Sequence, residues 1–271
     1  MFYRKIYYSL EMNSPHDIER INFLRTKILK AAFNSKEGHI ASSFSILDLL
    51  YCFYVLLPKI SMINFTKDDI FVLSKGHASL AIYAVLEESG IINSSWVENF
   101  CKWNSDFGGH PDVKKIREVN ASTGSLGHGL PISIGKIFAK RILNKPGKIY
   151  CLIGDGELNE GSNWESMLIA SHHKMHELTL IVDLNYSNNR SINLGNIQSK
   201  FESFGFIVKT INGHVHQEIL ESYLLKDSDK PVVIIANTIK GYGIKTMENN
   251  PEWHHAVPTI DQLNQFISEL A

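Results

Sequence analysis

The chain has 271 residues, a net charge of −1 and a hydrophobic content of 44%. That is enough for one large globular domain or two small ones, and the near-neutral charge gives no reason to expect a nucleic acid or an acidic membrane as a partner. Three cysteines without a C-x-x-C pair and the lack of a signal-peptide pattern at the start predict a cytoplasmic protein.

The first part of the chain is predicted to be helical. Ser14 and Pro15 are typical of a helix start, and apolar residues follow at helical spacing. A second helix is expected near Ser45. The most apolar run, 46–57, falls short of the roughly 20 residues that a membrane span needs. We therefore expect an N-terminal helical segment at about 14–60 and no membrane span.

The rest of the chain alternates between apolar strands and helices. Strands are predicted at 69–73, 148–153, 178–183, 206–210 and 232–236, and helices at 77–88, 93–103, 130–142, 159–174 and 216–225. Such alternation indicates a parallel β-sheet with helices on both faces. We expect an α/β protein that forms a single domain over residues 1–271.

A turn rich in acids follows the predicted strand at 148–153. Asp155 lies between Gly154 and Gly156, which we expect to let the backbone turn sharply, and Asn185 follows the next strand. The 30 residues that separate Asp155 from Asn185 fit one strand–helix–strand crossover. If the strands are neighbours, both side chains meet at one edge of the sheet, where ligands bind. Their oxygens would suit Mg²⁺ with a diphosphate, although the Gly-Asp-Gly tripeptide alone is more often an ordinary turn.

The Gly154-Asp-Gly156 turn with Asn185 resembles the thiamine diphosphate motif. With four further stretches, the chain is similar to the N-terminal half of a transketolase, and especially to split transketolases whose halves are separate chains. The four stretches are Gly38-His39, Ser74-Lys-Gly-His-Ala78, Ser122 to Pro131, and Lys240-Gly-Tyr-Gly243 through Met247 to His255.

The resemblance implies a thiamine diphosphate-binding fold and a site for that cofactor. It implies that Asp155, Asn185 and the carbonyl of Ser187 bind Mg²⁺, or another divalent cation such as Ca²⁺ or Mn²⁺. The positions that it places against the diphosphate or the aminopyrimidine ring are Gly156, Gly124 and Leu126.

Histidines and one glutamate are the implied catalytic residues. By resemblance, the histidines that line the channel to the thiazolium are His39, His77, His110 and His254. Of these, His77 and His254 would also lie near the diphosphate, with His255 as the alternative to His254. Glu160, and with less support Glu165, would belong to an acidic network that also touches the cofactor and connects two cofactor sites. Imidazole suits proton transfer on sugar hydroxyls because it titrates near neutral pH.

The implied activity is transfer of a two-carbon ketol unit from a ketose phosphate to an aldose phosphate. In the family, the glutamate that activates the cofactor lies on a pyrimidine-binding domain, and here the chain stops at Ala271. We therefore expect activity only with a separate C-terminal transketolase subunit, which carries the pyrimidine-binding and C-terminal domains, in an assembly with two copies of each chain.

Three other functions stay open on the sequence. The first is a subunit of another thiamine diphosphate enzyme, of the 2-oxo-acid dehydrogenase alpha or deoxyxylulose-phosphate synthase type. The second is a non-catalytic cofactor-binding subunit. The third, a nucleotide-binding α/β protein, is disfavoured because neither G-x-x-x-x-G-K-[ST] nor G-x-G-x-x-G occurs. Two departures from the family pattern, Ile-Ala-Ser-Ser after His39 and a short 188–206 segment without Asp-Gly, suggest a different sugar preference.

Overall fold

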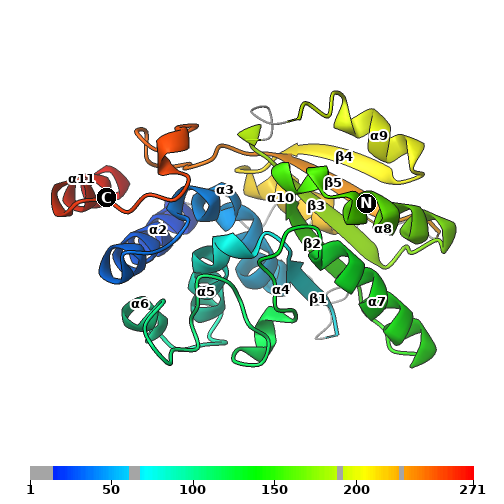
Figure 1. Ribbon diagram of the computed structural model, residues 1–271, viewed down its shortest axis with the longest axis horizontal. Coiled ribbons are helices and arrows are strands. Elements are labelled where there is room, and N and C mark those ends of the chain that lie inside the picture. Colours follow the sequence, from blue (N-terminus) through cyan, green and yellow to red (C-terminus); the bar gives the residue numbers. More distant parts are fainter. Residues whose placement is uncertain (1–14, 61–67, 188–191, 226–228) are drawn as a thin grey trace.

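A parallel five-stranded sheet forms the centre of the molecule, as the sequence predicts (Figure 1). The computed structural model describes residues 15–60, 68–187, 192–225 and 229–271. The sheet order is β1-β2-β3-β5-β4, with every neighbouring pair parallel. The strands are β1 (Ile70–Leu73), β2 (Ile149–Gly154), β3 (Leu178–Leu184), β4 (Ile207–Asn212) and β5 (Val232–Asn237).

Helices cover both faces of the sheet, so successive strand residues enter two separate cores. Leu152 and Ile181 pack in the core beneath α3, α5 and α10, whereas Ile153 and Val182 pack in the core beneath α7, α8 and α9. The helices are α2 (Pro15–Ser35), α3 (Ile40–Tyr51), α4 (Leu57–Ile60), α5 (Ser79–Glu88), α6 (Trp96–Asn99), α7 (Gly129–Ile142), α8 (Gly161–His172), α9 (Ile197–Ser203), α10 (His216–Tyr223) and α11 (Ile260–Leu270). Burial on both faces explains why the central strands are apolar without alternation.

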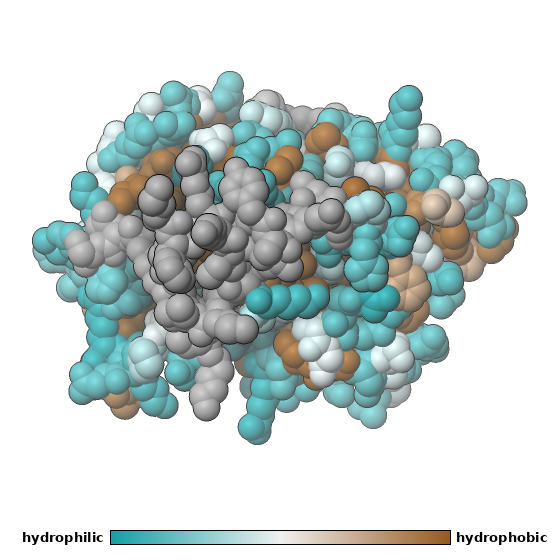
Figure 2. Space-filling view, turned by 180° about the vertical axis from the view of Figure 1, so that it is seen from behind, coloured by the Kyte–Doolittle hydropathy of each residue, from teal (hydrophilic) through white to brown (hydrophobic). Residues whose placement is uncertain are grey.

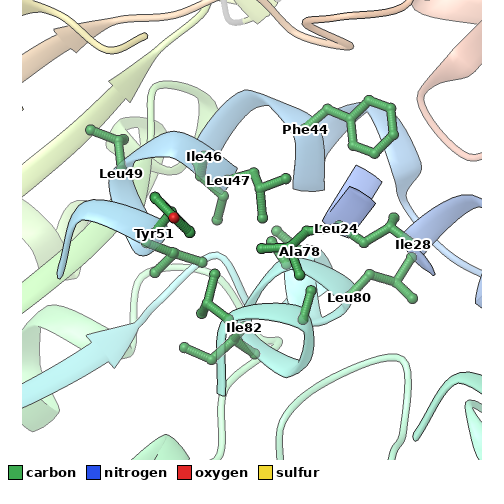
Figure 3. Packing of buried hydrophobic residues seen from close by; sticks show 14 of the residues in the cluster. Leu24, Ile28, Phe44, Ile46, Leu47, Leu49, Tyr51, Ala78, Leu80 and Ile82 are labelled. Atoms are coloured by element: carbon green, nitrogen blue, oxygen red, sulfur yellow. The ribbon is translucent and has the colours of Figure 1, made fainter. Parts of the chain in front are cut away.

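The N-terminal helices form the larger core. Leu24 and Ile28 of α2 point toward Leu47 of α3 and Leu80 of α5 (Figure 3). A π-helix at Cys52–Leu56 joins α3 to α4, and the combined helix Ile40–Lys59 has the length and hydropathy of a membrane span, but 94% of its most apolar window is buried inside the protein. Its apolar character therefore serves packing within the fold.

The structure differs from the predicted elements most at four helices. The helix predicted at 93–103 is only α6, because Phe100 adopts an extended conformation and Cys101 has a φ of 54°. The helix expected near Ser45 begins earlier, at Ile40. Helices α9 and α11 were not predicted. Ser14, the predicted helix cap, lies outside the described residues.

Candidate active site

The acidic turn and the Asn185 segment lie at adjoining strand ends. Gly154, the last residue of β2, pairs with Asp183 of β3, and the Asp155 N–H donates to the Asp183 carbonyl at 3.1 Å. The neighbouring strands that the sequence predicts are therefore present. Asp155 and Asn185 directly follow these two strands, and both are buried.

Asp183 organises this edge of the sheet, although no sequence pattern indicates a role for it. Its fully buried carboxylate pairs with Lys75 Nζ at 2.5 Å and accepts hydrogen bonds from Ser45 Oγ at 2.7 Å and Thr238 Oγ1 at 2.5 Å. Burial would raise the pKa of Asp183, but Lys75 and the hydroxyl donors together lower it. The group is thus a buried anion that ties four segments together.

The same carboxylate fixes the orientation of the Asn185 amide. Asn185 Nδ2 donates to Asp183 Oδ2 and to Ser45 Oγ, both at 3.1 Å. The amide oxygen consequently faces Ser187, whose N–H and Oγ donate to it at 3.2 and 2.5 Å. The amide oxygen is therefore on the side of the 185–187 loop, and oxygen is the ligand atom that a hard divalent cation takes.

Glu157, the middle acid of the turn, is held by the protein itself. It is buried, and its carboxylate accepts hydrogen bonds from Ser74 Oγ, from the Gly127 N–H at 2.8 Å and from the Gly154 N–H at 3.3 Å. Burial raises its pKa despite these donors. Glu157 thereby joins the acidic turn to the 122–131 loop.

Two cavities flank Tyr186. The larger, of about 520 Å³, is lined by Asn185, Ser187, Lys240 and His254 together with residues 249–251. The smaller, of about 320 Å³, contains Asp155 and Leu158 at its wall. The predicted metal ligands thus come together at one sheet edge but border different cavities.

The glycines of the Gly-Asp-Gly turn are not needed for its shape, contrary to the expectation from the sequence. Gly154 and Gly156 do not have positive φ angles, and a Cβ at Gly156 would meet no atom within 4 Å. Gly124 is one of the glycines that the 122–131 loop requires, because its φ is 149° and a Cβ would lie 2.8 Å from the His110 ring.

The predicted catalytic histidines form one cluster. The ring centroid of His39 lies 5.1 Å from that of His77, 5.6 Å from that of His254 and 4.5 Å from that of His255. His110 packs over Gly124. Both candidates for the last position therefore contact His39, with His255 also 3.3 Å from a Glu37 oxygen.

The surroundings of His39, His77 and His254 favour the neutral imidazole form. Burial, followed by the neighbouring His255 and His254, lowers the pKa of His39 to about 4. Burial and Lys75 lower the pKa of His77, and burial and Lys240 lower that of His254. Neutral rings can accept protons as well as donate hydrogen bonds, which is what a general base needs.

Lys240 is a site residue that was not among the predicted ones. Its Nζ lies 2.7 Å from His254 Nδ1 and 3.4 Å from Ser187 Oγ. An ammonium group has only donors, so His254 Nδ1 accepts this bond and the ring proton of the neutral form is on Nε2. The sequence signal was present, because Lys240 opens the Lys-Gly-Tyr-Gly stretch.

The remaining predicted residues lie around the 122–131 loop. Leu126 is half-buried. Glu160 precedes α8 and is exposed, with its side-chain stem against Gly127, and Glu165 on α8 is also exposed. The described residues include no group of three His, Cys, Asp or Glu side chains arranged for a metal ion. A metal here would depend on amide and carbonyl oxygens beside Asp155, which are ligands that a hard cation accepts.

Fold and site together define an α/β protein with buried polar side chains and two cavities at the carboxyl ends of its strands, which is the edge where such sheets bind ligands. The family described as transketolase, thiamine diphosphate binding domain, matches residues 16–270. The chain belongs to this family. It is 36% identical to one subunit of the apulose-4-phosphate transketolase of Actinobacillus succinogenes, over 91% of this chain and 93% of that protein.

Full-length transketolases extend well beyond the matched region. The human transketolase is 33% identical over 92% of this chain and 41% of its own length. The crystal structure of transketolase from Campylobacter jejuni superposes with a TM-score of 0.82 at 31% identity, covering 95% of this chain and 43% of that one. The chain therefore spans about two fifths of these proteins but nearly all of the Actinobacillus relative.

Proposed function

We propose that this chain is the thiamine diphosphate-binding subunit of a two-chain transketolase that transfers a ketol unit between sugar phosphates. The main support is the register of β2 and β3, which sets Asp155 and Asn185 at adjoining strand ends; Asn185 borders the cavity lined by Lys240 and His254, and Asp155 borders the neighbouring one. Two relatives whose names denote one subunit of a transketolase support the existence of a partner chain. We further propose that residues 1–271 form one domain, that the metal is Mg²⁺ or a similar divalent cation, and that the enzyme is cytoplasmic.

The site residues would divide the work as follows. Asp155, Asn185 and the Ser187 carbonyl hold the cation, and Gly156 leaves open space for the diphosphate. Gly124 and Leu126 border the aminopyrimidine. The bound cofactor supplies the nucleophilic carbon that accepts the ketol unit.

The site histidines would accept and return protons on the sugar hydroxyls. His39, His77 and His254 form the compact group, and His110 extends it toward Gly124. Glu160 would connect this site to that of a second copy. The partner subunit would supply the pyrimidine-binding domain and the basic residues that recognise the sugar phosphate, in an assembly with two copies of each chain.

Replacement of the carboxylate tests the metal and cofactor site directly. Asp155→Ala should fold normally and lose Mg²⁺-dependent binding of thiamine diphosphate in calorimetric titrations. Glu269→Ala, which removes an exposed carboxylate from helix α11, serves as the control and should keep cofactor binding. Unchanged cofactor affinity in Asp155→Ala would refute the site.

Reconstitution tests the activity. This chain should show no ketol transfer alone and should gain it when mixed with the chain encoded beside its gene, thiamine diphosphate and Mg²⁺. A ketose phosphate donor distinguishes transketolase from an enzyme that acts on 2-oxo acids. Apulose 4-phosphate is a donor to test because two of the relatives carry its name.

A further inference from the structure

A buried cluster of charged side chains lies behind the site, between α2, α3 and the end of β4. Asp48 of α3 is its centre. Arg25 of α2 and His214 contact one oxygen of Asp48 at 3.1 and 3.0 Å, and His216 contacts the other oxygen at 3.1 Å. Burial would raise the pKa of Asp48, but Arg25 and the two histidines hold it well below its ordinary value. These contacts therefore favour the ionised form of Asp48.

The sheet register brings this cluster to the loop that enters the site. Asn212 at the end of β4 pairs with Asn237 at the end of β5, so His214 and Ile239 each lie two residues beyond paired strand ends. The backbone N–H of Ile239 donates to His214 Nε2 at 2.9 Å. Lys240, the next residue, places its Nζ 2.7 Å from His254 Nδ1.

The contacts of His214 define its tautomer. A backbone N–H can only donate, so His214 Nε2 must be unprotonated, and the proton of the neutral ring is on Nδ1, where Asp48 accepts it. The opposite tautomer would set the Nε2 proton against the Ile239 N–H. Asp48 therefore selects the ring form that can hold the Lys240 loop. The ring is also clamped against Tyr242, with centroids 3.6 Å apart, and the Arg25 guanidinium lies 5.2 Å from the Tyr242 ring centroid.

We propose that His214 is a positioning residue that acts through the Ile239 amide to hold Lys240 against His254. Asp48 sets the tautomer that this task requires. His214 lies outside the proposed cofactor site and histidine channel. Its effect on the position of Lys240 is a structural claim, and only the use of Lys240 and His254 in ketol transfer rests on the proposed function. His214 contacts the loop of Lys240 at two points, the Ile239 amide and the stacked Tyr242 ring, and the Ile239 bond is the contact directly before Lys240.

Two substitutions separate the two hydrogen bonds of His214. In His214→Gln, the side-chain oxygen can take the place of Nε2 and accept the hydrogen bond from the Ile239 N–H. In His214→Asn, the side chain is one methylene shorter, so it can keep only the contact that Nδ1 makes with Asp48. His216→Asn is the matched control, because it removes a contact to the other oxygen of the same carboxylate.

The readouts use the full 271-residue chain without cofactor or partner, so they do not depend on the proposed enzyme activity. Amide hydrogen exchange reports the Ile239 bond, and ¹⁵N chemical shifts of the rings, measured well above the ordinary pKa of histidine, report the tautomer of His254. His214→Asn should accelerate Ile239 exchange roughly tenfold, as expected for one lost hydrogen bond, and should let His254 exchange between both tautomers. His214→Gln should retain most of the wild-type behaviour, and His216→Asn should lower the unfolding midpoint without either change.

The proposal is overturned if His214→Asn leaves Ile239 exchange and the His254 tautomer unchanged, or if His216→Asn alters both as strongly. If His214→Asn does not fold, the ¹⁵N shifts of the His214 ring in the wild-type chain still test the proposal. They should show a protonated Nδ1 and an unprotonated Nε2, and the reverse pattern refutes the mechanism.

Discussion

Lys75 and Asp183 form the residue pair on which the site is built. Both are almost fully excluded from solvent, and breaking such a pair leaves a buried charge that typically costs about 3–5 kcal/mol. Lys75→Met should therefore lower the free energy of unfolding by roughly that amount. Urea denaturation of Lys75→Met and of the double variant with Asp183→Asn tests this, because the neutral amide should restore part of the loss. Equal stability of wild type and Lys75→Met would show that the pair contributes little.

The histidine cluster makes stability depend on pH. His39 has a pKa of about 4 in the folded protein against an ordinary 6.5, so the unfolded chain binds more protons between these values. Stability from this group is complete above pH 6.5 and is lost as the pH falls toward 4. Denaturation midpoints between neutral and mildly acidic pH should fall less steeply for His39→Asn than for wild type. Parallel pH profiles would contradict the assignment.

The sequence predicts the site residues that stand at a characteristic spacing. It does not predict the roles of residues that depend on packing between distant segments. Asp155 and Asn185 stand at crossover spacing beyond two apolar strands, so the strand ends were predicted correctly. Asp183 and His214 act through contacts between segments more than 20 residues apart, and although Lys75 lies in the recognised Ser74–Ala78 stretch, its pairing with Asp183 is a contact of the same kind. No local pattern marks such contacts, because burial, which makes them strong, arises only when the sheet forms.

Gly124 and Gly156 lie in two different loops and have different structural roles. Gly124→Ala should distort its loop, because the φ of 149° disfavours a side chain and the Cβ would overlap the His110 ring; the expected cost is about 1–3 kcal/mol. Gly156→Ala should leave stability unchanged, since its Cβ meets open space, and should weaken cofactor binding. Thermal unfolding with cofactor titrations checks both variants. The reverse pattern would show that the Gly-Asp-Gly turn is shaped by backbone strain after all.

Strands and long amphipathic helices were predicted within a few residues, and the errors have physical reasons. The strand at 178–183 differs from β3 by one residue at its end. Helix α11 was missed although Thr259 and Gln262 form a capping box at its start. The predicted 93–103 helix ends early because the chain leaves the helical conformation at Phe100 and Cys101 has a positive φ, where its N–H donates to the Phe107 carbonyl.

The surface of the whole molecule bears on its assembly. Seen from behind, hydrophobic residues occur in small groups among hydrophilic ones (Figure 2). Large apolar side chains are exposed on α8, where Leu168 and Ile169 are 60% and 42% accessible. They lie three and four residues after Glu165, on the same side of the helix. If Glu165 and Glu160 connect two cofactor sites, this side of α8 must face the second copy.

Leu168→Lys should therefore weaken the assembly without unfolding the chain. A charge in a packed interface must be desolvated, whereas an exposed leucine contributes little to the isolated fold. Sedimentation velocity of this chain mixed with its partner subunit should show loss of the species that contains two copies of each chain. Ile18→Lys is the matched control, because Ile18 is 53% exposed on α2, away from Glu160, and should leave sedimentation unchanged. If Leu168→Lys sediments like wild type, the α8 surface does not join the two copies, and the acidic connection proposed through Glu160 loses its structural basis.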